Sequence, residues 1–268
     1  MTNTHKKRPR LYINLFGAPL MLGAMYYGDI FFILLFSGVS FFSIYEFSNM
    51  CKKMEYSQIE LIPYCALFLL TISSLDIYLV SIHQVLLLSI IIGMILTVIM
   101  DLKEPIAAIS LSIFSTVWIG LFYYSIVSIR LDEVSGLPLT IAMFVSVWIC
   151  DSAAYIFGKQ FGNKKIAPTI SPKKTLIGSL SGLVCALLFM SSFYQFNWLG
   201  YDLSLLNTIL LGFIFGGLSQ FGDLFESKFK RIAKIKDSSH FLQGHGGFLD
   251  RFDSLMISAP TTLFILNF

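Results

Sequence analysis

Apolar runs long enough to cross a lipid bilayer recur from residue 11 to the end of this 268-residue chain. A transmembrane helix needs about 17 to 25 mostly apolar residues to cover roughly 30 Å of hydrocarbon. Hydrophobic residues make up 56% of the chain and charged residues only 13%, whereas soluble domains carry roughly a quarter charged residues. The sequence therefore predicts an all-α, polytopic integral membrane protein, in which residues 1–268 form a single membrane-embedded unit.

Charge clusters and turn residues divide the chain into about nine predicted transmembrane helices. These spans cover residues 11–27, 29–48, 60–75, 78–100, 106–127, 138–157, 176–194, 205–222 and 254–268. Residues 1–100 are N-terminal helices, whereas residues 101–268 hold the polar motifs. The basic start MTNTHKKRPR leads into an apolar stretch without a small-residue cleavage site, so we expect a retained first helix.

The distribution of basic residues predicts the orientation of these spans. Positively charged loops remain on the cytoplasmic side of a membrane. If the N-terminus is cytoplasmic, every one of the 19 Lys and Arg residues except Arg130 falls in a cytoplasmic segment. The nine-span division and a cytoplasmic N-terminus therefore support each other.

Residues 158–175, GKQFGNKKIAPTISPKKT, form a cytoplasmic loop with five lysines and no acidic residue. Such a loop attracts anions. The simpler interpretation is attraction to acidic lipid headgroups, and charge alone does not separate this from a binding role.

Asp151 lies inside the sixth predicted span, in VWICDSAAYIFGK. A carboxylate at the bilayer centre costs about 2.5 to 3.5 kcal/mol or more, so intramembrane acids commonly mark functional sites. Tyr155 is four residues later and hence on the same helical face. We expect this pair to face a polar cavity and contact substrate; a hydrogen bond between helices without further function is the alternative.

Asp223 lies at the cytoplasmic end of the eighth predicted span, in SQFGDLFESKFKR. Gly222 before it allows close approach of a backbone or a ligand. A basic run follows, which includes Lys228, Lys230 and Arg231. By itself this run could be a snorkelling anchor beside a membrane helix.

The segment GHGGFLDRFDS, residues 244–254, changes that interpretation. Its three glycines leave backbone amides able to face an anion, and Asp250 and Asp253 are spaced to share one face of the helix that follows. Proteins commonly hold Mg²⁺ with one or two carboxylates together with substrate phosphates. His245 stands between glycines without an evident packing role, so we expect it to contact substrate.

These residues carry a resemblance to a known family. Residues 227–253, SKFKRIAKIKDSSHFLQGHGGFLDRFD, resemble the long signature of CDP-diacylglycerol synthases, also called phosphatidate cytidylyltransferases. GDLFES and DSAAYIFGKQFGNKKIAPTISPKKT also resemble blocks of that family, so the likeness covers residues 151–254. Gln243, Leu176 and Ile177 depart from the family pattern.

The resemblance implies a nucleotidyltransferase that converts CTP and phosphatidate into CDP-diacylglycerol and pyrophosphate with Mg²⁺. It implies that Asp223 and Asp250 bind the metal ion and that Asp253 supports them as a third catalytic acid. The implied substrate-binding residues are Lys173, Lys174, Arg231, His245, Gly246 and Gly247, beside Asp151 and Tyr155. The expected setting is a bacterial inner membrane with the site facing the cytoplasm and membrane lipids around it. A second, monovalent cation and a homodimer are compatible with the family, and we expect no nucleic-acid partner.

Two other function classes are compatible with parts of this pattern. A CTP-dependent polyprenol kinase would transfer the terminal phosphoryl group of CTP instead of the nucleotidyl group. A membrane transporter would also have many spans and an intramembrane acid, but it would more often place polar residues at mid-membrane in several helices. Here the polar residues concentrate on one predicted cytoplasmic surface, which favours the enzyme.

Overall fold

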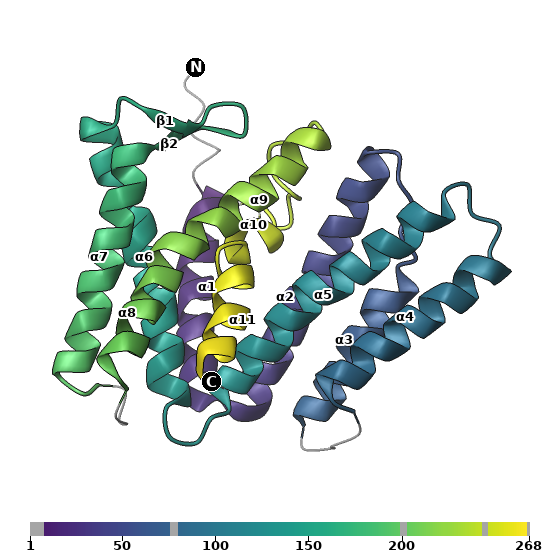
Figure 1. Cartoon of the computed structure of the whole chain (residues 1–268), viewed down its shortest axis with the longest axis horizontal. Helices are drawn as coiled ribbons and strands as arrows, with labels where there is room; N and C mark the ends of the chain where they lie inside the picture. Colours follow the sequence, from purple (N-terminus) through teal and green to yellow (C-terminus); the bar gives the residue numbers. More distant parts are fainter. Residues whose placement is uncertain (1–7, 76–79, 199–202, 243–245, 267–268) are drawn as a thin grey trace. The chain divides into compact units, whose positions relative to one another are not determined.

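The computed structural model describes residues 8–75, 80–198, 203–242 and 246–266, which fold mostly into α-helices (Figure 1). The helices before the hairpin are α1 (Arg8–Tyr27), α2 (Asp29–Lys53), α3 (Leu61–Ser74), α4 (Ile82–Ile99), α5 (Pro105–Arg130) and α6 (Gly136–Phe161). The later ones are α7 (Leu176–Gln195), α8 (Leu205–Phe213), the π-helix η2 (Ile214–Leu218), α9 (Ser219–Ile232), α10 (Leu249–Phe252) and α11 (Leu255–Leu266).

Within the described residues, six helical stretches are long and apolar enough to cross a membrane. They are α2, α4, α5, α6, α7 and the continuous run α8–η2–α9. Helices α3 and α11 are apolar but shorter. The prediction of a helical, polytopic integral membrane protein is thus confirmed, whereas nine crossings and a cytoplasmic N-terminus stay predictions.

The chain divides into two compact units. The first comprises residues 1–123 and 232–251, and the second comprises residues 124–231 and 252–268. This division by contacts does not follow the sequence-based division at residue 100, because the late segment 232–251 packs with the N-terminal helices. The single membrane-embedded unit stays a prediction.

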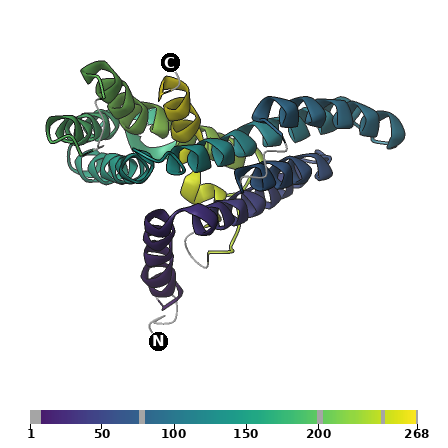
Figure 2. The same cartoon turned by 90° about the horizontal axis from the view of Figure 1, so that it is seen from below.

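Helix α2 is central to the first unit. It packs against both α1 and α3, and Figure 2 shows α1 turning sharply away from it. Its buried face includes Phe32, Phe36 and Phe47, each without exposed surface. Every Cβ of a helix lies on a fixed face, so the rigid packing of α2 also fixes the direction of the polar side chains between these phenylalanines.

The second unit is built on the paired helices α6 and α7 (Figure 1). They are joined by a hairpin in which β1 (Lys165–Ala167) pairs antiparallel with β2 (Ser171–Thr175). Thr175 then caps α7, because its side-chain oxygen accepts a hydrogen bond from the amide of Gly178 (3.2 Å). The loop predicted to carry the lysines is therefore an ordered hairpin held between two helices.

The run α8–η2–α9 packs along α7 through α8 and η2. Its middle turn is a π-helix, Ile214–Leu218. Such turns are rare and occur frequently near functional sites. Here the π-turn immediately precedes α9, the helix that carries the acidic residues of the second unit.

Candidate functional site

Three carboxylates meet in the second unit. Oxygen atoms of Asp223, Glu226 and Asp253 all lie within 4.8 Å of one another. Asp223 and Glu226 are three residues apart on α9, so they share a helical face, and Asp253 lies in the turn between α10 and α11. The structure thus brings together two of the three predicted catalytic acids.

Gly222 makes this meeting sterically feasible. A Cβ atom added at Gly222 would lie 2.4 Å from the backbone oxygen of Asp253 and 3.1 Å from the Cα of Ser254. Both contacts are to backbone, which cannot rotate away as a flexible side chain can. The absence of a side chain at Gly222 therefore allows the chain around Asp253 to approach α9.

Two lysines neutralise part of the acidic cluster. The Nζ atom of Lys174 lies 2.7 Å from Oδ2 of Asp223 and donates a hydrogen bond to the backbone oxygen of Gln220 (3.1 Å). Lys230 pairs with Glu226 one turn earlier on α9. Lys174 comes from β2, so the hairpin contributes directly to this site.

Asp253 is, like Glu226, a buried acid of this cluster. Its side chain is buried, and Oδ1 accepts a hydrogen bond from the amide of Ser254 (2.6 Å). Burial, followed by the neighbouring Asp223 carboxylate and more weakly by Asp151, raises the pKa of Asp253 well above its usual value. An ionised Asp253 would therefore gain from a further positive charge at this place.

The donor set of the cluster fits a hard divalent cation. Two of the three carboxylates pair with lysines, so the cluster would carry one net negative charge with Asp253 ionised. Carboxylate oxygens are the ligands that Mg²⁺ takes in proteins, usually one or two together with water and substrate phosphates. Asp223, Glu226 and Asp253 are therefore suitable ligands for such an ion.

The hairpin carries the predicted phosphate-binding lysines. Lys173 is exposed on β2, whereas the neighbouring Lys174 points to Asp223. Arg231, at the end of α9, donates a hydrogen bond from Nε to the backbone oxygen of Ile170 (3.1 Å) in the turn of the hairpin. This hydrogen bond from Arg231 holds the lysine hairpin against α9.

Asp151 and Tyr155 lie on an exposed part of α6. Tyr155 is 69% exposed, and the Nζ atom of Lys159 lies 6.0 Å from the centre of its ring. The electrostatic influence of Asp151 on Asp253 connects this position with the acidic cluster. A substrate contact for Asp151 or Tyr155 stays a prediction.

Asp250 belongs to the first unit and has different partners. Its Oδ2 atom accepts hydrogen bonds from the amide and hydroxyl of Ser238 (2.8 and 2.9 Å) and from the amide of Gly247 (2.8 Å). Gly246 adopts a positive φ of 83° in the same segment. Helix α10 ends at Phe252, so Asp250 and Asp253 do not share one helix as their spacing suggested. The roles predicted for Asp250, Gly246 and Gly247 stay predictions, and His245 lies outside the described residues.

Glu226 and Gln220 were not predicted from the sequence to belong to the site. Glu226 follows Asp223 by three residues, a spacing that could have indicated a shared helical face. Gln220 is buried, and its side chain bonds to Ser179 as both donor and acceptor while its backbone oxygen accepts from Lys174. A glutamine in a mixed polar and apolar run gives no such signal, because its role depends on the packing of α7 against α9.

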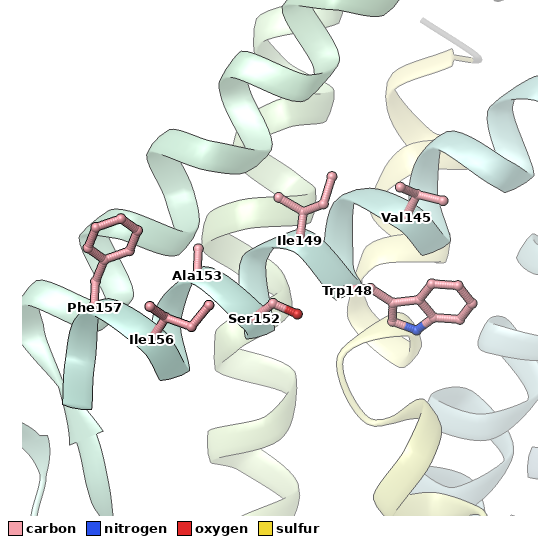
Figure 3. Close-up of a pocket in the computed structure, with 7 residues that line it drawn as sticks. All are labelled: Val145, Trp148, Ile149, Ser152, Ala153, Ile156 and Phe157. Carbon is pink, nitrogen blue, oxygen red and sulfur yellow. The ribbon is translucent and has the colours of Figure 1, made fainter. Parts of the chain in front are cut away.

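An apolar cavity of about 470 Å³ lies against α6 (Figure 3). Its lining residues are Val145, Trp148, Ile149, Ser152, Ala153, Ile156 and Phe157. This lining contains no acidic or basic side chain, so the cavity offers no ligand for a phosphate or a metal ion. The acidic cluster is the stronger candidate for chemistry.

Comparison with known proteins finds a matching family model and several similar proteins. The model of a family described as the cytidylyltransferase family matches residues 8–268. Proteins named phosphatidate cytidylyltransferase are similar to this chain: one from Staphylococcus haemolyticus is 45% identical over 149 residues, covering 54% of each chain. Another from Haemophilus influenzae is 43% identical over 131 residues, covering 48% of this chain and 46% of the relative. The matched segment thus spans about half the length of these curated relatives.

Proposed function

This chain belongs to the cytidylyltransferase family, and we propose on that premise that it is a phosphatidate cytidylyltransferase of phospholipid biosynthesis. A phosphate oxygen of phosphatidate would attack the α-phosphorus of CTP. The bond between the α-phosphorus and the bridging oxygen to the β-phosphate would break, so that CDP-diacylglycerol forms and pyrophosphate leaves. The names of the similar proteins support this choice of substrates.

The observation that carries the proposal is the acidic cluster beside a lysine hairpin. Phosphoryl and nucleotidyl transfer require positioning and charge stabilisation more than covalent participation of the protein. Asp223, Glu226 and Asp253 supply carboxylate oxygens at one place, and Lys174 reaches the same place from β2. Anionic phosphates and a divalent cation are the ligands that this combination of charges suits.

In this proposal Asp223, Glu226 and Asp253 hold Mg²⁺. The ion would supply positive charge to the phosphate oxygens of CTP. The prediction that Asp250 also binds the ion rests on the family resemblance, as do a second, monovalent cation and a homodimer. Lys173, exposed on the hairpin, would bind phosphate directly, while Lys174 would set the charge and position of Asp223.

The expected location of the reaction follows from its substrates. CTP is a cytosolic nucleotide and phosphatidate is a membrane lipid. We therefore propose that the protein lies in a bacterial inner membrane with its N-terminus and site on the cytoplasmic side, where its basic segments would also be placed. Phosphatidate would enter laterally from the inner leaflet.

Parallel reactions with CTP labelled at the α- or γ-phosphate test the proposal. Purified protein would be incubated with Mg²⁺ and either phosphatidate or a polyprenol, and lipid and aqueous products would be identified. We expect the α-label in CDP-diacylglycerol and the γ-label in pyrophosphate, both abolished in Asp223→Asn. Transfer of the γ-label into a lipid would instead show a kinase, and incorporation of neither label would reject both enzymes.

A further inference from the structure

Glu46, in the C-terminal half of α2, holds a segment from near the other end of the chain. Its carboxylate accepts hydrogen bonds from the hydroxyls of Ser238 (2.8 Å) and Ser239 (2.6 Å). It also accepts from the backbone amides of Phe248 (3.0 Å) and Leu249 (2.8 Å). All five residues belong to the first unit.

These contacts match what a buried carboxylate requires. Glu46 has no exposed surface, and leaving an ionised carboxylate without partners in such a place is strongly unfavourable. Two carboxylate oxygens offer about four acceptor positions, and four protein donors are directed at them. Hydrogen bonds to an ionised acceptor are stronger than those between neutral groups, so this set fixes the segment in one conformation.

Aromatic contacts reinforce the same attachment. Phe42, one turn before Glu46, stacks on Phe248 with ring centres 5.1 Å apart and an interplanar angle of 13°. Its ring also lies 5.1 Å from that of Phe241, which Tyr45 contacts as well at 5.9 Å. One face of α2 therefore contacts Phe241 and Phe248. These two residues flank residues 242–247, which hold three glycines and are called the glycine-rich loop below.

A backbone hydrogen bond joins the two described residues that flank residues 243–245. The amide of Leu242 donates to the backbone oxygen of Gly246 (3.1 Å). A Cβ atom added at Gly247 would lie 2.3 Å from both carboxylate oxygens of Glu46. Glycine at this position thus lets the carboxylate reach the backbone of the loop.

Ser238 connects Glu46 to Asp250. Its hydroxyl lies 2.8 Å from Oε2 of Glu46 and 2.9 Å from Oδ2 of Asp250. Asp250 also accepts from the amide of Gly247. A change at Glu46 would therefore alter the position of Asp250 as well as that of the loop backbone.

We propose that Glu46 is a positioning residue for substrate binding: it holds residues 238–242 and 246–249 in the conformation that presents them and Asp250 to phosphate-bearing substrates. This role rests on the proposed cytidylyl transfer. Glu46 acts through the loop and does not contact the reacting atoms. The inference assigns a function in the reaction to the N-terminal helices.

Glu46→Gln is the principal test variant, because it keeps the shape and replaces one acceptor oxygen with an NH₂ group that cannot accept. We expect amide hydrogen exchange in residues 238–249 to accelerate about tenfold or more. We expect the KM for CTP or phosphatidate to rise about tenfold, with a smaller change in kcat, in the range typical of residues that orient a site through others. Glu46→Asp, which keeps the charge, should recover part of the wild-type KM.

Glu60→Gln provides the matched control. Glu60 is also a carboxylate of the first unit, and it accepts from Ser48 (2.6 Å) and pairs with Lys52 (2.6 Å) away from the loop. Exchange in residues 238–249 and both KM values should stay at wild-type levels in this variant. Equal losses in Glu60→Gln and Glu46→Gln would overturn the specific role of Glu46.

Ser239→Ala removes one of the donors to Glu46. This smaller change provides a test of the proposal even if Glu46→Gln does not fold. It should accelerate exchange in the loop and raise the same KM by about two- to fivefold, because the hydroxyl donates to Glu46 and also accepts from the amide of Phe241 (3.2 Å). Unchanged exchange in Ser239→Ala and in folded Glu46→Gln would refute the attachment of the loop to Glu46. Faster exchange with unchanged KM values would refute a role of that attachment in substrate binding.

A wild-type protein that makes no CDP-diacylglycerol would refute the proposed function, while the exchange comparison would still decide whether Glu46 holds the loop.

Discussion

Lys174 on β2 and Asp223 on α9 form an ion pair of 2.7 Å between Nζ and Oδ2. The same lysine donates to the backbone oxygen of Gln220 (3.1 Å), so its position is defined from two directions. The adjacent Lys173 is exposed and lies on the same strand. Two consecutive lysines in this hairpin therefore have different surroundings, and we propose that they have different tasks.

Replacing each lysine separately should distinguish these tasks. Lys174→Ala leaves Asp223 beside the other two carboxylates without this partner, so we expect kcat/KM to fall about 100-fold, the effect of roughly 2.7 kcal/mol. Lys173→Ala should mainly raise the KM for a phosphate-bearing substrate, by about five- to tenfold. Steady-state kinetics with both substrates would measure this, and equal effects of the two changes would contradict the assignment.

Asp253→Asn should separate stability from activity. The buried carboxylate lies beside Asp223, and removing one negative charge relieves their repulsion. We expect the melting temperature in EDTA to be equal to or higher than that of the wild type. Stabilisation by added Mg²⁺ and CDP-lipid formation should both be lost. Thermal unfolding with and without Mg²⁺ tests this, and wild-type Mg²⁺ stabilisation in Asp253→Asn would remove Asp253 from the ligand set.

Gly222→Ala should damage the site without changing any charged group. The added methyl group would lie 2.4 Å from the backbone oxygen of Asp253, and overpacking of this kind typically costs about 1–3 kcal/mol. We expect a lower melting temperature and a large loss of activity.

Gly217→Ala is the matched control for this substitution. Gly217 lies in the same helical run, and its nearest neighbour is a ring carbon of Phe213 at 3.5 Å, an ordinary contact. It should retain wild-type activity. If Gly222→Ala behaved as Gly217→Ala does, close approach at Gly222 would not be required.

Arg231→Lys should reveal whether Arg231 acts by its charge or by its geometry. Lysine keeps the positive charge but lacks the guanidinium geometry that bonds to Ile170 in the turn of the hairpin. We expect faster hydrogen exchange in residues 165–175 and a KM for CTP raised about threefold or more. Lys228→Ala, at an exposed position of α9, is the control for loss of one cation. A fully active Arg231→Lys with unchanged hydrogen exchange in residues 165–175 would indicate that Arg231 acts only through its positive charge.

Parts of the site could be read from sequence spacing because they depend on one helix. Asp223 and Ser227 are four residues apart, a spacing that places them one helical turn apart, and the Ser227 hydroxyl donates to Oδ1 of Asp223 at 3.2 Å. Glu226 follows Asp223 by three residues, so the same local spacing could also have predicted its place in the cluster. Glu46 could not be found this way, since its partners follow about 200 residues later and no local period connects them.

The sequence by itself determined that this protein is built for a membrane and that its secondary structure is mainly helical. Apolar length and the placement of charges predict helices in a membrane, because a bilayer requires internally bonded backbone over a set distance. Which acids meet was decided only by tertiary packing: Gly222 admits the chain at Asp253, a hairpin brings Lys174 to Asp223, and α2 holds the late glycine loop through Glu46. Contacts between distant segments depend on steric fit and on the pairing of buried charges, and neither leaves a regular spacing in the chain.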